Sequence, residues 1–202
     1  MKGDRKMFAV FKKELRSYFI NAIGYVYVGV YLAIAALLCC YTTLGSQSYS
    51  TKTYFTMMVF AFIILIPLLT MKLFSEEKKL RTEQLLLTAP ISIWQMILGK
   101  FLAAFALFAG TVAVSCINFF PLYSYARIER SGATYSELHV GPVTAEIFAC
   151  VIGLIFMGAA FIAIGLFISS LTENQLSAAV ITIAVILVMV VTMETSTIVD
   201  TI

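Results

Sequence analysis

Charged residues are scarce in this sequence, and their scarcity excludes a soluble globular domain. Of the 202 residues only 12% are charged, whereas 61% are hydrophobic and the mean hydropathy is +0.96. Soluble domains contain roughly 25% charged and about 45–50% apolar residues. Only 4 prolines and 11 glycines interrupt the chain, and no Pro-rich or Ser/Gly-rich linker divides it. The composition predicts an all-α integral membrane protein that forms a single membrane domain over residues 1–202.

The apolar residues gather in stretches long enough to cross a membrane as helices, which takes about 20 residues each. About five transmembrane helices are predicted, at residues 23–44, 54–74, 96–120, 145–170 and 176–193. Between the second and third spans lies a loop at 75–95, and between the third and fourth a longer loop at 121–142. Thr172, with Gln175 three residues later, predicts a capping box at the start of the fifth span.

Lys and Arg are distributed unevenly between the two sides that these spans define. Of the 14 Lys and Arg residues, eleven lie in residues 1–16 or around the 75–95 loop, and three lie on the other side: Lys52, Arg127 and Arg130. Positively charged flanks remain in the cytoplasm. We therefore predict a multi-pass protein of the cell membrane with a cytoplasmic N-terminus, a cytoplasmic 75–95 loop and an external 121–142 loop.

Residues that carry out chemistry are missing from the spans. No ionisable side chain lies near a span centre, and we expect Lys100, Glu146 and Glu194 at span ends to reach the membrane interface. The motifs of zinc and serine hydrolases are absent, and Gly99-Lys100 lacks the Ser or Thr that completes a phosphate-binding loop. The four cysteines lack metal-ligand spacing. We expect no enzymatic activity, no bound metal or cofactor, and no nucleic-acid partner for this chain.

The N-terminal segment 7–20 has the pattern of a helix that lies in the membrane interface. Hydrophobic positions recur at helical spacing: Phe8, Phe11, Leu15, Tyr18 and Phe19. Charged residues fall largely on the other side: Lys12, Lys13, Glu14 and Arg16. This pattern predicts an amphipathic helix whose partner is the lipid bilayer. The alternative is a basic flank that only fixes topology.

The fourth span carries small residues at helical spacing. Gly158, Gly165 and Ser169 are separated by seven and four residues, and such spacing lets helices pack closely in lipid. Packing within one chain is the ordinary interpretation. The alternative is an interface with another subunit or with a transport pathway.

The 75–95 loop is predicted to contain an amphipathic helix. Charged residues open it at Glu76–Lys79, an apolar side follows at Leu85–Leu87, and Pro90 ends it. Such a helix is too polar for burial in lipid and too apolar on one side to be simply solvated. It favours a docking surface for a protein partner, and the alternative is a solvated loop that anchors topology.

Residues 67–104, "PLLTMKLFSEEKKLRTEQLLLTAPISIWQMILGKFLAA", resemble the loop between spans two and three of ABC-2-type permeases, the membrane subunits of type V ABC transporters. Residues 11–26 resemble the N-terminal elbow helix of these permeases, and residues 160–175 resemble their turn between spans four and five. The three blocks occur in family order. The resemblance is closest to the short permeases of the gliding-motility and nitrous-oxide-reductase-maturation groups.

The resemblance implies that a separate ABC ATPase subunit, which binds ATP and Mg, docks on a cytoplasmic coupling helix between spans two and three. By position, the residues that contact the ATPase are Glu76, Glu77, Lys78, Lys79, Arg81, Thr82, Leu85, Leu86 and Pro90. Two positions depart from the family pattern. Arg81 replaces a common Gly and should make the helix more continuous, and Gln84 replaces a Glu and removes a carboxylate.

The resemblance also implies the function of a permease subunit, in an exporter, that works as a homodimer or with a paralogous permease. The family has six spans, whereas this sequence ends at Ile202 soon after the fifth. We therefore expect a chain without the sixth span, either truncated or an unusual member. The alternative function is a membrane scaffold or assembly factor that recruits a soluble cytoplasmic partner. The absence of mid-membrane charge favours an amphipathic or hydrophobic cargo.

Overall fold

The computed structural model describes residues 2–20, 22–44, 51–74, 92–124 and 144–199, with the side chains of 2–6, 44 and 194–199 excepted. Every regular element in these ranges is helical, which confirms the all-α fold class. Five helices are long and apolar enough to span a membrane: Ile23–Thr43, Lys52–Thr70, Ile93–Ser124, Thr144–Leu171 and Gln175–Met193. The predicted coupling helix and almost all of the predicted external loop lie outside the described residues.

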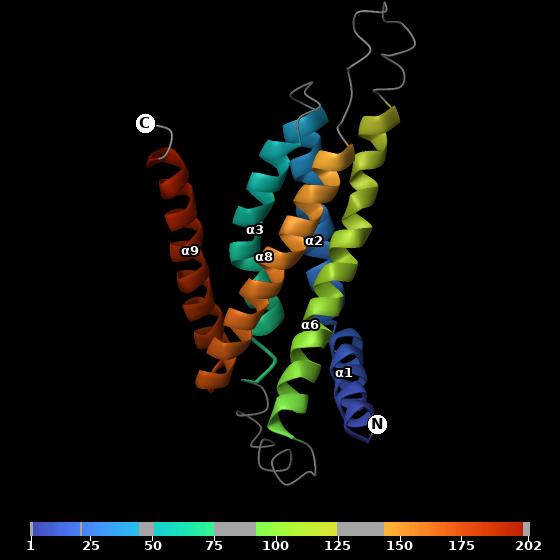
Figure 1. The fold of residues 1–202 in the computed structure, drawn as a ribbon, viewed down its shortest axis with the longest axis vertical. Coiled ribbons are helices and arrows are strands. Elements are labelled where there is room, and N and C mark those ends of the chain that lie inside the picture. The colour runs from blue at the N-terminus through green and yellow to red at the C-terminus, as the bar shows by residue number, and fades with distance from the viewer. Residues whose placement is uncertain (1, 21, 45–50, 75–91, 125–143, 200–202) are drawn as a thin grey trace, which may run out of the picture.

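The α-helices in chain order are α1 (Lys2–Ile20), α2 (Ile23–Cys39), α3 (Lys52–Thr70), α6 (Ile93–Ser115), α8 (Thr144–Leu171) and α9 (Gln175–Val199), and a π-helical turn, η1 (Cys40–Leu44), directly follows α2. Figure 1 shows α2, α3, α6 and α8 running lengthwise together, with α1 beside one end of α6. The end of the bundle where α1 lies is called the α1 end below. α9 starts at this end and contacts both α8 and α3, and Val190 in its second half is still buried against the bundle.

The centre of the bundle is packed around aromatic side chains of α3 and α6. Phe62 and Phe108 are fully buried and meet edge to face, with 5.3 Å between ring centroids. The ring of Phe108 occupies the space where Gly158 of α8 would carry a Cβ atom. Because lipid supplies little hydrophobic drive for helix association, such close contacts are what hold spans together.

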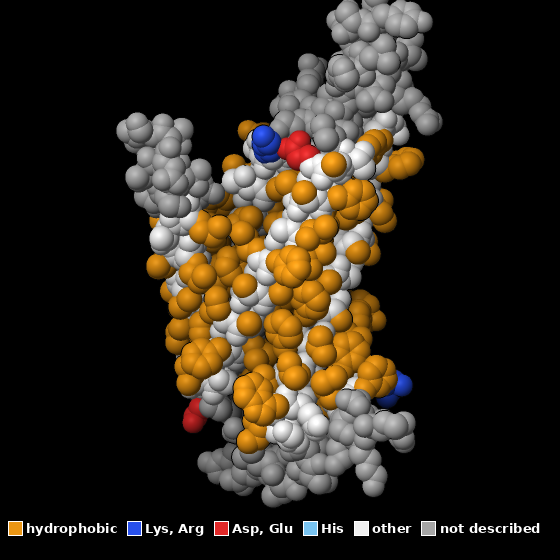
Figure 2. Space-filling view, viewed as in Figure 1, with side chains coloured by type: hydrophobic (Ala, Val, Ile, Leu, Met, Phe, Trp, Pro, Cys, Tyr) orange, Lys and Arg blue, Asp and Glu red, His pale blue; other side chains and the backbone are white. Residues whose placement is uncertain are grey.

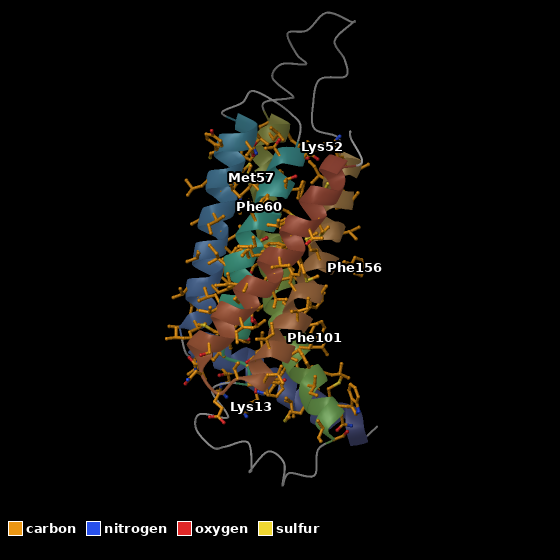
Figure 3. The ribbon with its side chains drawn as sticks, turned by 90° about the vertical axis from the view of Figure 1, so that its left-hand side faces the viewer. Lys13, Lys52, Met57, Phe60, Phe101 and Phe156 are labelled. Carbon is orange, nitrogen blue, oxygen red and sulfur yellow. The ribbon has the colours of Figure 1, made fainter. Side chains whose placement is uncertain are left out.

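The outer surface has the distribution of side chains that a bilayer requires. Figure 2 shows hydrophobic side chains covering the middle of the visible face, with charged side chains confined to its two ends. Figure 3 places Lys52 at one end and Lys13 near the α1 end, with Phe156 between these levels. Exposed aromatic and aliphatic side chains between two charged levels match a hydrocarbon layer between two interfaces.

Several boundaries differ from those predicted. α1 begins at Lys2 rather than at residue 7, and the second span ends as α3 at Thr70 rather than at residue 74. Pro67 lies in the last turn of α3 and has no N–H to bond the carbonyl of Ile63, while its own carbonyl accepts a hydrogen bond from Met71 N at 2.9 Å. Residues 71–74 form a turn instead, in which Leu73 N donates to the carbonyl of Thr70 at 3.1 Å.

The third span is longer than the predicted 96–120, because helical structure extends over Ile93–Ser124. A 3-10 turn, η2 (Cys116–Phe119), interrupts it, and helix resumes at Phe120. Pro121 was predicted to begin the external loop, but it occupies the first turn of the resumed helix. A proline is accepted there since the N–H at that position has no helical acceptor.

The predicted capping box before the fifth span is wrong. The hydroxyl of Thr172 donates back to the carbonyl of Ile168 at 3.1 Å, so it serves the end of α8. Asn174 holds the position before α9, and its carbonyl accepts a hydrogen bond from Ala178 N at 3.0 Å. Threonine hydroxyls often bond the carbonyl four residues earlier, and this local bond competes with capping of the next helix.

Candidate functional site

The candidate site lies at the α1 end, where α1, α3, α6 and α8 meet next to the predicted coupling segment. α1 approaches α6 closely at Gly99, where a Cβ atom would lie 2.9 Å from Cγ1 of Val10 and 3.3 Å from the carbonyl of Met7. The backbones come together there because glycine has no side chain. This contact places the side chains of α1 against the beginning of the third span.

A buried lysine organises the site. Lys100 is only 1% exposed, and its Nζ donates to the carbonyl of Leu73 at 2.7 Å and pairs with Oε1 of Glu14 at 3.3 Å. Nζ also lies 4.9 Å from the ring centroid of Phe74. A buried ammonium is tolerated only with such partners. The prediction that Lys100 reaches the interface is therefore wrong, because acceptors within the protein hold it.

Glu14 reaches Lys100 from α1, on a face that also contains Val10 and Tyr18. These residues recur every four positions and so lie above one another on one side of the helix. Both apolar neighbours are buried, and the Glu14 side chain is 13% exposed. The prediction that Glu14 belongs to the polar side of α1 is wrong, since pairing with Lys100 replaces its contact with water.

Tyr18 provides a second link between α1 and α3. Its hydroxyl donates to the carbonyl of Leu69 at 3.0 Å. Leu69 lies in the last turn of α3, where carbonyls lack intrahelical partners. Burial, and secondarily the negative charge of Glu14, raise the pKa of the Tyr18 hydroxyl above its usual range. Tyr18 therefore remains a neutral hydrogen-bond donor at physiological pH.

α8 joins the site through two of the small residues singled out in the sequence. Gly165 packs against the side chain of Thr70, which fills the space where a Cβ would be. One turn further on, the hydroxyl of Ser169 accepts a hydrogen bond from Phe74 N at 3.2 Å. With Gly158 against Phe108, all three residues are placed in contacts within the chain.

The predicted elbow residues divide between two faces of α1. Tyr18 is buried, Phe11 and Leu15 are half-buried, and Phe8 and Lys12 are exposed. The predicted ATPase contacts all lie outside the described residues: Glu76, Glu77, Lys78, Lys79, Arg81, Thr82, Leu85, Leu86 and Pro90.

Sequence reasoning missed the pairing of Lys100 with Glu14. Two signals pointed to it. One is the adjacent Gly99, which permits close packing, and the other is the four-residue spacing of Glu14 from Val10 and Tyr18.

Residues 41–201 match the family described as ABC-2 family transporter protein. Because the match covers most of the chain, this protein belongs to that family and is a membrane permease of an ABC transporter. In such transporters the ATPase activity lies in a separate subunit. No curated protein and no solved structure gives a significant match.

Proposed function

We propose that this permease belongs to an exporter and that residues 75–93 couple ATP hydrolysis by a separate subunit to movement of the spans. The supporting observation is a set of hydrogen bonds that fix the end of the second span and the turn just before this segment. Leu69 accepts from Tyr18 of α1 and Leu73 accepts from Lys100 of α6. Phe74 N donates to Ser169 of α8. A force applied to the segment by a docked ATPase therefore acts on four packed helices together.

The segment is anchored on its other side as well, because α6 begins at Ile93 and carries Lys100 two turns later. The two ends of the coupling segment are thus joined through the bond from Lys100 to Leu73. Displacement of the segment moves α3 and α6 as a unit. This is the mechanical arrangement that a coupling element needs, since packed helices move as rigid bodies.

In the proposed assembly the α1 end faces the cytoplasm, as the excess of Lys and Arg there predicts. Two copies of the permease, or one copy with a paralogue, enclose the pathway, and two ATPase subunits bind ATP and Mg below them. The cargo is amphipathic or hydrophobic. The described parts of the spans support this choice, because their charged side chains lie toward the two ends.

Affinity purification of the intact complex in mild detergent tests this function. The expected co-purifying protein is an ATPase with a phosphate-binding loop, and mutation of that loop's lysine should abolish hydrolysis by the complex. Hydrolysis that survives in the permease alone would contradict the proposal. A soluble partner without nucleotide-binding motifs would instead support the scaffold function.

A further inference from the structure

The outward side of α1 carries a cluster of cations, Lys12, Lys13 and Arg16, here called the cationic face. All three side chains are exposed. None forms an ion pair with another residue in the part of the chain that the structure describes. The carboxylate of Glu14, which lies between these positions in the sequence, is turned the other way and pairs with Lys100. The positive charge of this face is therefore not neutralised within the described protein.

The three cations stand close enough together to bind one anionic group. Positions 12 and 16 are one turn apart on the same side of the helix, and position 13 lies beside them. Together with Ala9, Ser17 and Ile20 they line an open depression of about 560 Å³. Lys and Arg side chains in such a cluster are the usual ligands of phosphate groups in proteins.

Exposed apolar side chains flank the cationic face and indicate what it meets. Phe8 lies one turn before Lys12 and is 62% exposed, and Ile20 lies one turn after Arg16 and is also exposed. Trp94 is exposed at the start of α6, against which α1 packs. Cations between exposed aromatic and aliphatic side chains, beside the start of a span, are typical of the level of lipid headgroups.

We propose that the cationic face binds the headgroups of anionic phospholipids in the leaflet at the α1 end. The phosphates contact Lys12, Lys13 and Arg16, and the acyl chains lie beside Phe8 and Ile20. Figure 3 shows the level of Lys13 at this end of the bundle. An anionic phospholipid has both a negatively charged headgroup and apolar acyl chains, so the cations together with the exposed apolar side chains beside them favour this ligand. This inference is independent of the coupling role of residues 75–93.

Native mass spectrometry of the full chain in mild detergent tests this proposal. The protein is titrated with phosphatidylglycerol or with phosphatidylcholine of the same acyl composition. We expect phosphatidylglycerol to bind at least tenfold more tightly. Each cation should contribute about fivefold, so the triple variant Lys12→Gln, Lys13→Gln, Arg16→Gln should lose the preference.

Two controls separate a specific face from total charge. The charge-preserving variant Lys12→Arg, Lys13→Arg, Arg16→Lys should keep the preference, and so should Lys52→Gln at the opposite end of the bundle. Equal binding of the two lipids by the wild type would overturn the proposal. The proposal would also be overturned if the triple Gln variant kept the preference for phosphatidylglycerol. It would be overturned as well if Lys52→Gln lost as much of this preference as the triple variant. If the triple variant fails to fold, the three single Gln variants give the same comparison.

Discussion

Glu14 and Lys100 form a buried ion pair across the contact between α1 and α6, with 3.3 Å between Oε1 and Nζ. The N-terminal helix is thereby fixed to the third span, and Lys100 extends the link to the end of the second span through Leu73. Lys100 therefore joins α1 to the elements on either side of the predicted coupling segment.

Loss of one member of this pair should destabilise the protein more than loss of an exposed charge. Glu14→Ala leaves the ammonium of Lys100 buried without its carboxylate, and such changes cost up to about 3–5 kcal/mol, less where one partner is partly exposed as here. The double variant Glu14→Leu, Lys100→Met should recover much of the loss. Thermal unfolding in detergent gives the comparison, with exposed Lys13→Gln as the control. Equal midpoints for Glu14→Ala and Lys13→Gln would contradict this prediction.

Tyr18→Phe should remove the hydrogen bond to Leu69 and lower stability by about 1 kcal/mol or more, since a buried carbonyl loses its donor. The matched control is Tyr25→Phe, because Tyr25 is 63% exposed. The raised pKa of Tyr18 adds a dependence on pH. The advantage of wild type over Tyr18→Phe should be constant below about pH 10, the pKa of an unfolded tyrosine, and should shrink above it. An advantage that grows above this pH would refute the argument from burial.

Glycines of α8 should differ in their tolerance of alanine. Gly165→Ala places a methyl group against Thr70 and should destabilise the protein, whereas Gly153 has open space around its Cβ position. Gly153→Ala should be neutral or stabilising, because alanine favours a helix by about 1 kcal/mol over glycine. Gly158→Ala should also destabilise, and trimming Phe108 to Leu in the same chain should restore part of the loss. The thermal unfolding midpoints of the purified variants test this prediction. Indistinguishable midpoints for Gly165→Ala and Gly153→Ala would contradict the close packing of Gly165 against Thr70.

The orientation in the membrane can be tested by labelling single cysteines in a background without the four native ones. The distribution of Lys and Arg predicts that Glu83→Cys is protected in intact cells and that Ala133→Cys is labelled from outside. The reverse pattern would place the α1 end outside and would exclude docking of a cytoplasmic ATPase there.

The spans could be predicted because hydrocarbon selects for the length and composition of each helix independently of its neighbours. The five helices accordingly fall within a few residues of the predicted ranges. Their ends were less predictable, since Pro67 and Pro121 both lie inside helical structure, although Pro121 was expected to begin a loop.

The ion pair of Glu14 with Lys100 could not be predicted in the same way. The two residues are 86 positions apart, and their contact exists only because α1 folds back along α6. Local patterns placed Glu14 with the polar residues and Lys100 at the interface, which are reasonable positions for isolated helices. The pairing depends on tertiary packing, and its only local signs are Gly99 beside Lys100 and the four-residue spacing of Glu14 from the buried Val10 and Tyr18.

The central claim is that residues 75–93 couple ATP hydrolysis to movement of the spans. The rate of ATP hydrolysis by the purified complex of permease and ATPase tests this claim most directly. Glu76→Lys with Glu77→Lys, or Leu85→Asp, should release the ATPase or abolish the stimulation of hydrolysis by cargo, because losing a buried charged contact at an interface costs roughly 2–5 kcal/mol. Lys52→Glu at the opposite end is the control and should behave as wild type. If both coupling variants keep wild-type association and stimulation at equal expression, residues 75–93 only anchor topology and the proposed coupling role is wrong.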